Sequence, residues 1–522
     1  MDYDIVIFWI VCFSCLAGAI VAWRRMRFAA RGWIALYLSV LLLAVAGSWL
    51  DRPLMIRSAA AIWFVFLVLP GLIGKLYYRR FVQQNYASAR RLARIISWLH
   101  PADDWTKVPE IIHALELAQQ GNIAAATEVL ERYQDVKSQI GLMAMVNYYR
   151  ITNQWEELLP WLARHCQGVE QYSQILPIEL RARGETGDIR GLVELYDRCR
   201  EQIGKLVPES SRDTCRLMLF AFCGQRQSVE DLCNGRLAVL PAAVRAFWLA
   251  TADLAAGQSE AARQQLEALL PAADPPMRAA IERRLARISL PREPLDAAAM
   301  QVLEDAAVEH VHEERFAGQR TLFSHKALAT QILIALNVLM FFVEVYRGGS
   351  TNGFVLYDLG ALFPPTVRED HQWWRLIAAL FLHYGELHLA MNMIALWILG
   401  PFVEFALGLR RFVLVYLLAG IGSMATVMAF SSPAHEHFTV GASGCIMGLV
   451  GATAALMLKG WLRERALAAQ RRLVAVLLIV AMQTVFDSLV PQVSMTAHLS
   501  GACIGFVATL FLRDRLRQPA AA

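Results

Sequence analysis

GASGCIMGLVGATAALML, residues 441–458, is an apolar run that opens with a serine between small residues. A helix needs roughly 20 predominantly apolar residues to cross a bilayer. Small residues three or four positions apart let a second helix approach the backbone closely inside a membrane. The stretch therefore predicts a membrane-spanning helix that packs tightly against its neighbours and carries Ser443 at one end.

Eight further apolar runs of similar length predict an all-α, polytopic membrane protein. Five share the same half of the chain, at 327–345, 375–399, 412–430, 473–490 and 495–512, and three lie near the beginning, at 5–23, 33–50 and 58–76. Arg57 and Pro70 border or interrupt the last of these, which either spans the bilayer or lies at its surface. All basic clusters fall on one side if the N-terminus is outside and the chain after residue 80 is cytoplasmic. We expect about nine spans and a cytoplasmic C-terminus.

The composition of the 522 residues also indicates a membrane protein. Hydrophobic residues make up 56% and charged residues 18%, whereas soluble domains carry about a quarter charged residues. The net charge of +5 comes mainly from Arg and Lys beside apolar runs, so it indicates membrane orientation rather than nucleic-acid binding. The nine cysteines are scattered, and we expect reduced thiols, no metal and no cofactor. A bacterial inner membrane suits this composition.

Residues 81–322 separate the two groups of apolar runs and have helical periodicity. Turn residues punctuate this region at Gly121, Asn153, Gly187, Gly224 and Gly257, at intervals of 32, 34, 37 and 33 residues. Tetratricopeptide repeats are helical hairpins with a period near 34 residues. The region resembles a degenerate tetratricopeptide-like solenoid, and Ala126 and Ala262 match its small residue in the second helix. A generic array of helical hairpins is the alternative. Either form predicts a cytosolic protein or peptide partner, because solenoids present extended concave surfaces.

Polar residues at the ends of three apolar runs indicate chemistry, because ionisable side chains inside membranes are costly and commonly functional. HYGELHLAMN at 383–392 supplies His383, His388 and Asn392, and AHLSGACIG at 497–505 supplies His498. The expected topology places them, like Ser443, toward the outer leaflet. A serine hydroxyl needs a base that takes its proton, and histidine suits that role. Ser443 and His498 are therefore the candidate nucleophile and base.

Other residues complete the candidate site. The small-xxx-small spacing that permits close approach of two helices occurs in Gly444 and Gly448 and again in Gly501 and Gly505. The backbone N–H of Ser443, the side chain of Asn392 and His388 are candidate donors to a developing oxyanion. His388 and Asn392, four positions apart, share one helix face. His383 lies off that face, and we assign it to anchoring a loop.

These elements together resemble the rhomboid family of intramembrane serine proteases. The family's six-span core carries HxxxxHxxxN in its second span, GxSG in its fourth and a histidine followed by small residues in its sixth. The matching residues here are His383, His388 and Asn392; Gly441, Ser443 and Gly444; and His498, Gly501 and Gly505. Trp374–Arg375 match a pair that ends the family's long first loop, and Glu404 matches a Glu after the second span. The resemblance covers about residues 325–515.

The resemblance implies a dyad of Ser443 and His498 without an Asp, acting on membrane proteins in or near a transmembrane segment. Residues 346–372 would form the membrane-embedded first loop. Met447 is a departure, since some members place there an aromatic residue that stacks on the catalytic imidazole. A thioether also packs against a ring, for about 0.3–1.5 kcal/mol. Glu404 and Asp487 are expected to cap or bridge at the bilayer edge.

The single motifs also have structural interpretations. GxSG is common at helix contacts, His388 with Asn392 can be an interhelical hydrogen-bonding pair, and Trp374–Arg375 can anchor an interface. A catalytically silent adaptor, which binds transmembrane helices and recruits partners through its repeats, is the alternative function. A small-solute transporter is disfavoured because the spans lack paired internal symmetry.

The expected division of the chain is a membrane segment at 1–80, a cytosolic repeat domain at 81–322, a six-span protease domain at 323–517 and a tail at 518–522. The expected partners are transmembrane protein substrates, the lipid bilayer and a cytosolic partner of the repeats, but not nucleic acid.

Overall fold

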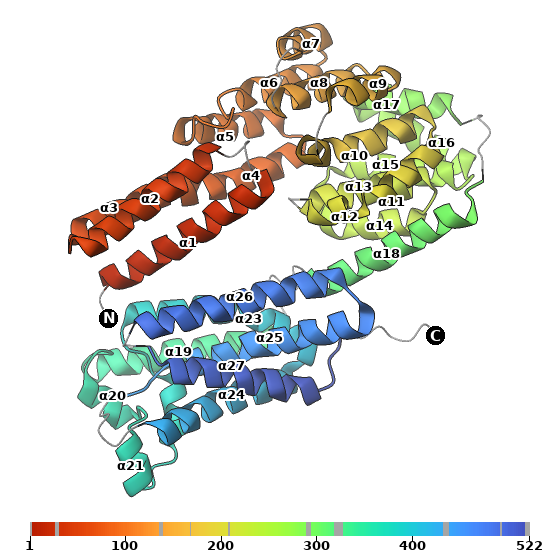
Figure 1. Ribbon diagram of the computed structural model, residues 1–522. Helices are drawn as coiled ribbons and strands as arrows, with labels where there is room; N and C mark the ends of the chain where they lie inside the picture. The colour runs from red at the N-terminus through yellow and green to blue at the C-terminus, as the bar shows by residue number, and fades with distance from the viewer. Residues whose placement is uncertain are drawn as a thin grey trace. The chain divides into compact units, whose positions relative to one another are not determined.

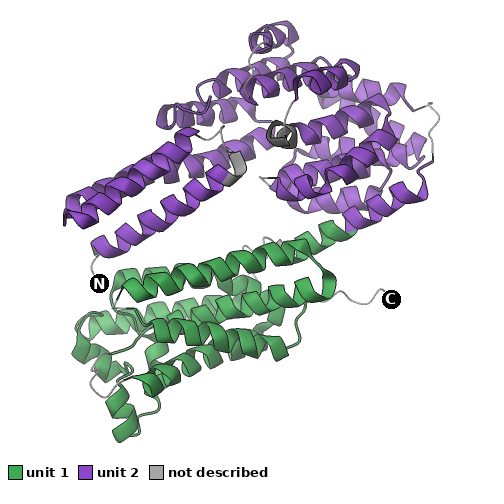
Figure 2. Cartoon of the chain, in the orientation of Figure 1, with its two compact units in different colours: residues 1, 308–522 green, residues 2–307 purple. Residues whose placement is uncertain are grey.

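The computed structural model describes residues 3–26, 31–134, 139–166, 169–206, 209–288, 294–317, 327–431, 438–490 and 493–516 (Figure 1). In these ranges the regular structure is helical, apart from an isolated bridge between Leu362 and Thr439. The all-α prediction is therefore confirmed for the described part of the chain. Two compact units form, one of residues 2–307 and one of residues 308–522 with residue 1 (Figure 2).

The first unit begins with apolar helices that pack against one another. Their bounds are α1 (Tyr3–Met26), α2 (Arg31–Trp49), α3 (Pro53–Trp63), a π-helical turn (Phe64–Val68) and α4 (Leu69–Val82). The last three elements form one apolar helix of 30 residues, about 45 Å long. The π-helical turn ends at Val68, two residues before Pro70, and a proline lacks the N–H of a regular helix. The run expected at 58–76 is thus part of a helix long enough to cross the bilayer, and the expected boundary at residue 80 falls inside α4.

Two cysteines in α1 have the CxxC spacing that metal and redox sites often use. Cys12 and Cys15 are one helical turn apart, and both are buried free thiols in the cluster where α1, α2 and α3 meet. In the described residues, no group of three His, Cys, Asp or Glu side chains is placed to hold a metal ion. Here the spacing places two small apolar side chains on the packed face of a helix.

The rest of this unit is an array of helices. They are α5 (Tyr86–Leu99), α6 (Val108–Gln119), α7 (Ile123–Glu131), α8 (Gln139–Ile151), α9 (Trp155–His165), α10 (Val169–Thr186), α11 (Ile189–Arg198), α12 (Arg200–Lys205), α13 (Glu209–Phe222), α14 (Arg226–Asn234), α15 (Ala242–Ala255), α16 (Ser259–Leu269), α17 (Pro275–Ala286) and α18 (Ala297–Ala317). Short 3₁₀ turns follow α14 (Arg236–Val239) and α16 (Leu270–Ala272).

Each of the five expected turn positions lies between two of these helices. The backbone φ angles are +94° at Gly121, +59° at Asn153, +86° at Gly187, +75° at Gly224 and +87° at Gly257. Such left-handed backbone is open mainly to Gly and Asn, which explains why these residues occur there. Residues 108–269 thus contain five helical hairpins. Membership of the tetratricopeptide family stays a prediction, and the expected boundary at 322/323 lies outside the described residues.

The second unit holds the remaining helices. They are α19 (Leu328–Tyr346), α20 (Gly353–Leu359), α21 (Pro364–Glu369), α22 (Arg375–Ala378), a 3₁₀ turn (Ala379–Phe381), α23 (Glu386–Leu407), α24 (Leu409–Phe430), α25 (Ser443–Glu464), α26 (Leu467–Leu489) and α27 (Met495–Phe511). Eight helices in the described ranges of the whole chain are long and apolar enough to cross a membrane, and α27 is apolar but shorter, with 17 residues. The chain is therefore an integral membrane protein.

One expected span had the wrong bounds. The run at 375–399 divides into the short helix α22, a 3₁₀ turn and α23, which starts only at Glu386 and continues to Leu407. Gly385, with φ +87°, separates the two parts. Apolarity alone does not distinguish a short buried turn from the first turns of a span. Glu404 consequently lies inside α23 rather than after it.

The core of the second unit is α25. Of its apolar window 83% is buried, against 17–44% for the other candidate spans of the chain, and it packs against α23, α24, α26 and α27 (Figure 1). A run rich in Gly and Ala lets neighbours approach from every side. Its N-terminus therefore lies at the centre of one end of the bundle.

Two polar side chains tie the elements around this core together. The carboxylate of Glu404 accepts hydrogen bonds from the N–H groups of Ala329 and Thr330, at 2.9 Å each, and thus caps α19. Arg375 is buried and donates to the carbonyls of Tyr357 and Ala361 at 2.7 and 3.0 Å. Arg375 therefore fixes the loop between α19 and α23 from inside.

Candidate active site

Ser443 is the first residue of α25 and the one residue of 441–450 that is not fully buried. The segment before it is fixed at two points: Thr439 pairs with Leu362 through two backbone hydrogen bonds, and Gly441 donates to the carbonyl of Ala379 at 2.8 Å. No side chain caps the N-terminus of α25. The N–H groups of its first turn, including that of Ser443, therefore have no partner within the helix. They can donate to a negative group placed beside the hydroxyl.

The two helices that carry Ser443 and His498 touch along their glycines. A Cβ on Gly501 would lie 2.3 Å from the carbonyl oxygen of Gly444, and one on Gly505 would lie 2.1 Å from that of Gly448. At the end near the serine, a Cβ on Gly444 would lie 3.7 Å from the carbonyl oxygen of Ala497. Ser443 and His498 are the chain neighbours of Gly444 and Ala497. The crossing thus brings the serine and the histidine to the same end of the helix pair.

His498 is held by a carboxylate from the neighbouring helix. Its Nδ1 lies 2.7 Å from Oδ2 of Asp487 in α26, and both side chains are buried. The amide of Gln483 donates to Oδ1 of the same carboxylate at 2.7 Å. A carboxylate only accepts hydrogen bonds, so the proton of a neutral His498 lies on Nδ1. This leaves the lone pair of Nε2 free to take a proton.

His388 lies close to Gly441, two residues before the serine. A Cβ on Gly441, whose φ is +124°, would lie 3.0 Å from Nε2 of His388 and 3.8 Å from Oγ of Ser443. Glycine is therefore required there by both the backbone angle and the imidazole. Nδ1 of His388 accepts the N–H of Tyr384 at 3.3 Å. In the neutral ring the proton then lies on Nε2, which points a donor toward the region of the Ser443 hydroxyl.

Asn392, His383 and Met447 are the other side chains that were expected at the site. Asn392 is buried, and its Nδ2 donates to the carbonyl of His388 at 3.0 Å. His383 is fully buried with its ring centroid 5.3 Å from that of His388, and its backbone N–H donates to Oε1 of Glu344 at 2.9 Å. The loop is thus anchored through the backbone of His383. Met447 is buried in α25, and its contact with the imidazole of His498 stays a prediction.

Comparison with known proteins agrees with this arrangement. A sequence profile of the rhomboid domain matches residues 370–515. The chain is 35% identical over 202 residues to Rhomboid protease GluP of Bacillus subtilis (strain 168), covering 38% of this chain and 38% of the relative. It is 32% identical over 151 residues to "Putative rhomboid protease YdcA" of the same organism, covering 29% of this chain and 69% of that protein. The chain belongs to the rhomboid family. Rhomboid protease AarA of Providencia stuartii is 27% identical over 206 residues, which cover 35% of this chain and 72% of the relative.

The rhomboid match concerns one part of the protein. The chain spans 38% of the length of GluP and 49% of a rhomboid-like protein of Arabidopsis thaliana. The profile match lies wholly within the second unit.

The roles of two buried carboxylates in this rhomboid unit were not predicted from the sequence. Asp487 was assigned to capping or bridging at the bilayer edge, and its bond to His498 was not expected. Glu344 in α19 is fully buried and holds the backbone before α23. The available signal was the same for both: a single acidic residue inside an apolar run is costly and marks a specific partner. Which partner it has depends on helix packing.

Proposed function

We propose that this protein is an intramembrane serine endopeptidase in which Ser443 is the nucleophile and His498 its base. The observation that carries the proposal is the buried hydrogen bond between Nδ1 of His498 and Oδ2 of Asp487, at 2.7 Å. His498 lies on α27, whose glycines contact the glycines of α25 that follow Ser443. This hydrogen bond leaves the imidazole with a free Nε2 at the end of the bundle where Ser443 is half-buried rather than fully enclosed. Membership of the rhomboid family supports the same reaction.

The residues suggest a sequence of proton transfers. Oγ of Ser443 attacks a peptide carbonyl while Nε2 of His498 takes the hydroxyl proton, and Asp487 stabilises the imidazolium without taking a proton itself. The oxyanion that forms is placed to accept from the backbone N–H of Ser443 and from Nε2–H of His388. Asn392 can join them by exchanging its bond to the His388 carbonyl. His498 then returns the proton to the leaving amine, and water resolves the acyl-enzyme by the same steps.

The substrates that fit this location are transmembrane proteins. Ser443 begins a helix that is itself a candidate span, and the carbonyl under attack must leave its own helical hydrogen bonding. We propose that substrates carry helix-weakening residues near the outer end of a transmembrane segment, where Gly and Pro reduce helical stability. We also propose that the N-terminus lies outside and that the repeats and the C-terminus are cytoplasmic, in a bacterial inner membrane.

The test is labelling of the detergent-purified protein with a fluorophosphonate probe, together with cleavage of a transmembrane reporter. We expect labelling of Ser443 by mass spectrometry, and loss of both labelling and cleavage in Ser443→Ala and in His498→Ala. Ser500→Ala is the matched control, since Ser500 lies two residues from His498, is half-buried and bonds only within its own helix. Cleavage that survives in Ser443→Ala contradicts the proposal. A folded wild type that neither cleaves nor labels favours the silent adaptor.

A further inference from the structure

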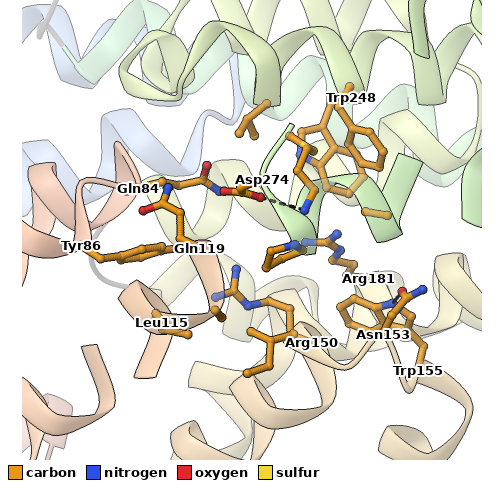
Figure 3. Close-up of a pocket in the computed structure, with 17 residues that line it drawn as sticks. Gln84, Tyr86, Leu115, Gln119, Arg150, Asn153, Trp155, Arg181, Trp248 and Asp274 are labelled. Atoms are coloured by element: carbon orange, nitrogen blue, oxygen red, sulfur yellow. Dashed lines mark hydrogen bonds between the residues drawn. The ribbon is translucent and has the colours of Figure 1, made fainter. Parts of the chain in front are cut away.

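A pocket lies inside the array of helical hairpins, far along the chain from the candidate active site (Figure 3). Helices from four of the five hairpins line it, with Gln119 from α6, Arg150 from α8, Arg181 from α10 and Trp248 from α15. The start of α17 closes it, because a Cβ on Gly121 would lie 3.7 Å from Pro275. The pocket is thus enclosed by both ends of the array, as expected for the concave side of a curved stack.

Arg181 lies between aromatic rings at one wall. Its Cζ is 4.9 Å from the ring centroid of Trp155 and 5.2 Å from that of Trp248. It forms an ion pair with Glu185 at 3.3 Å, but Glu185 also pairs with Arg284 at 3.0 Å. Arg283 lies 4.0 Å from the same carboxylate. One carboxylate is therefore shared by three guanidinium groups. The positive charge of Arg181 is held in place by the rings and only partly neutralised.

A second arginine adds to this positive charge. Arg150 is half-buried, and its Nε donates to Oδ1 of Asn147 at 3.1 Å, while no carboxylate in the described residues lies within ion-pair distance. Burial is the main cause that lowers the pKa of Arg181, with Glu185 opposing it and Arg150 lowering it further. The acidic residue of the lining is Asp274, whose Oδ1 caps α17 by accepting the N–H of Met277 at 2.9 Å. With two arginines and one aspartate, the lining carries one net positive charge.

We propose that this pocket binds a carboxylate-bearing peptide segment. Two guanidinium groups offer the forked donors that suit a carboxylate. The aromatic walls of Trp155 and Trp248 fit an apolar side chain next to that carboxylate, and the amides of Gln84 and Gln119 can bond to peptide groups. Asp274 opposes ligands with several negative charges, such as phosphates. The carboxylate comes either from a side chain or from a chain end.

The test uses three pools of randomised heptapeptides, with Asp, Glu, Lys and Arg excluded from the random positions. One pool carries a central Glu and an amidated end, one a free C-terminal carboxylate, and one has neither. Each pool is passed over immobilised full-length protein, and bound peptides are counted by mass spectrometry. The protein carries Ser443→Ala, so that the outcome does not depend on the proposed proteolysis. The stronger of the first two pools identifies the source of the carboxylate.

We expect the stronger carboxylate pool to be retained about tenfold more than the neutral pool, since charge-assisted hydrogen bonds are stronger than those between neutral groups. Arg150→Gln should abolish that difference, because Arg150 is half-buried at the pocket. Arg190→Gln is the matched control, since this arginine is exposed on α11 and pairs only with Glu194. Equal retention of all pools, or unchanged retention by Arg150→Gln, would overturn the proposal.

Discussion

A histidine can offer its lone pair on either ring nitrogen, and the group bonded to the other nitrogen decides which one. In this protein the choice for His498 is made by Asp487, a buried carboxylate 2.7 Å from Nδ1. For His388 the choice is made by the backbone N–H of Tyr384. The two imidazoles near Ser443 are therefore set for opposite tasks, His498 as an acceptor at Nε2 and His388 as a donor there.

Asp487→Asn tests the role of the carboxylate. An amide can donate to Nδ1 and so leave the proton on Nε2, where His498 cannot act as a base. We expect kcat for a transmembrane reporter to fall by roughly 100-fold, in the range of general-base contributions, with KM nearly unchanged. Asp487→Glu should retain more activity than Asp487→Asn.

The control for this change is Ser488→Ala, next to Asp487 but exposed and bonded only to the carbonyl of Val485. It should leave kcat unchanged. If Asp487→Asn keeps wild-type kcat, or if it raises KM alone, then Asp487 does not position His498.

At the level of elements, the site depends on how closely α25 and α27 cross. The glycines at their contact leave no room for a Cβ, because the carbonyl oxygens of the partner helix would lie 2.0–2.3 Å away at Gly451, Gly501 and Gly505. Inside a membrane such packing replaces the hydrophobic effect as the force between helices. A small increase in side-chain volume must therefore separate the helices and carry Ser443 away from His498.

Gly505→Ala is the minimal change of this kind. Its Cβ would meet backbone atoms, which cannot move aside as a side chain can. We expect the free energy of unfolding to fall by about 1–3 kcal/mol, as for overpacked cores, measured by thermal unfolding in detergent. Gly74→Ala, in α4, provides the comparison, because its Cβ would meet nothing within 4 Å. That variant should be neutral or slightly more stable, since Ala favours helices over Gly. Equal destabilisation by both would contradict the role of the crossing.

At the level of the whole molecule, the chain combines a rhomboid unit with a unit made of apolar helices and helical hairpins. The first unit contains candidate spans followed by an array of helical hairpins, and α4, part of the last of these spans, leads into the array. The rhomboid sequence follows after α18. The proposed orientation places the hairpins in the cytoplasm and the loop before α23 outside.

Cysteine labelling in intact cells tests this orientation. A membrane-impermeant maleimide should modify Glu369→Cys, at the exposed end of α21, without permeabilisation. It should modify Arg190→Cys, exposed on α11, only after the membrane is opened. The wild type serves as the control for the native thiols, of which Cys503 is the exposed one among the described cysteines. The reverse pattern would invert the topology.

Features that depend on one segment at a time could be predicted from the amino-acid sequence. The length of an apolar run decides whether a helix can span, so the membrane helices were predicted, with errors confined to their ends. The five hairpin turns were predicted because left-handed backbone selects Gly or Asn locally. Ser443, His388 and His498 were predicted as site residues because polar groups inside apolar runs are rare, and their roles stay predictions.

Which groups meet could not be predicted in this way, because it depends on how separate elements pack. Three contacts join different elements: Asp487 bonds to His498, Glu404 caps α19, and Arg375 holds the first loop. That α23 begins at Glu386 depends on the glycine-linked turn packed before it. The positive pocket of the hairpin array arises from residues on separate helices. Apolar periodicity shows which face of a helix is buried, but the partner of a buried charge depends on the distance between helices, which no single segment encodes.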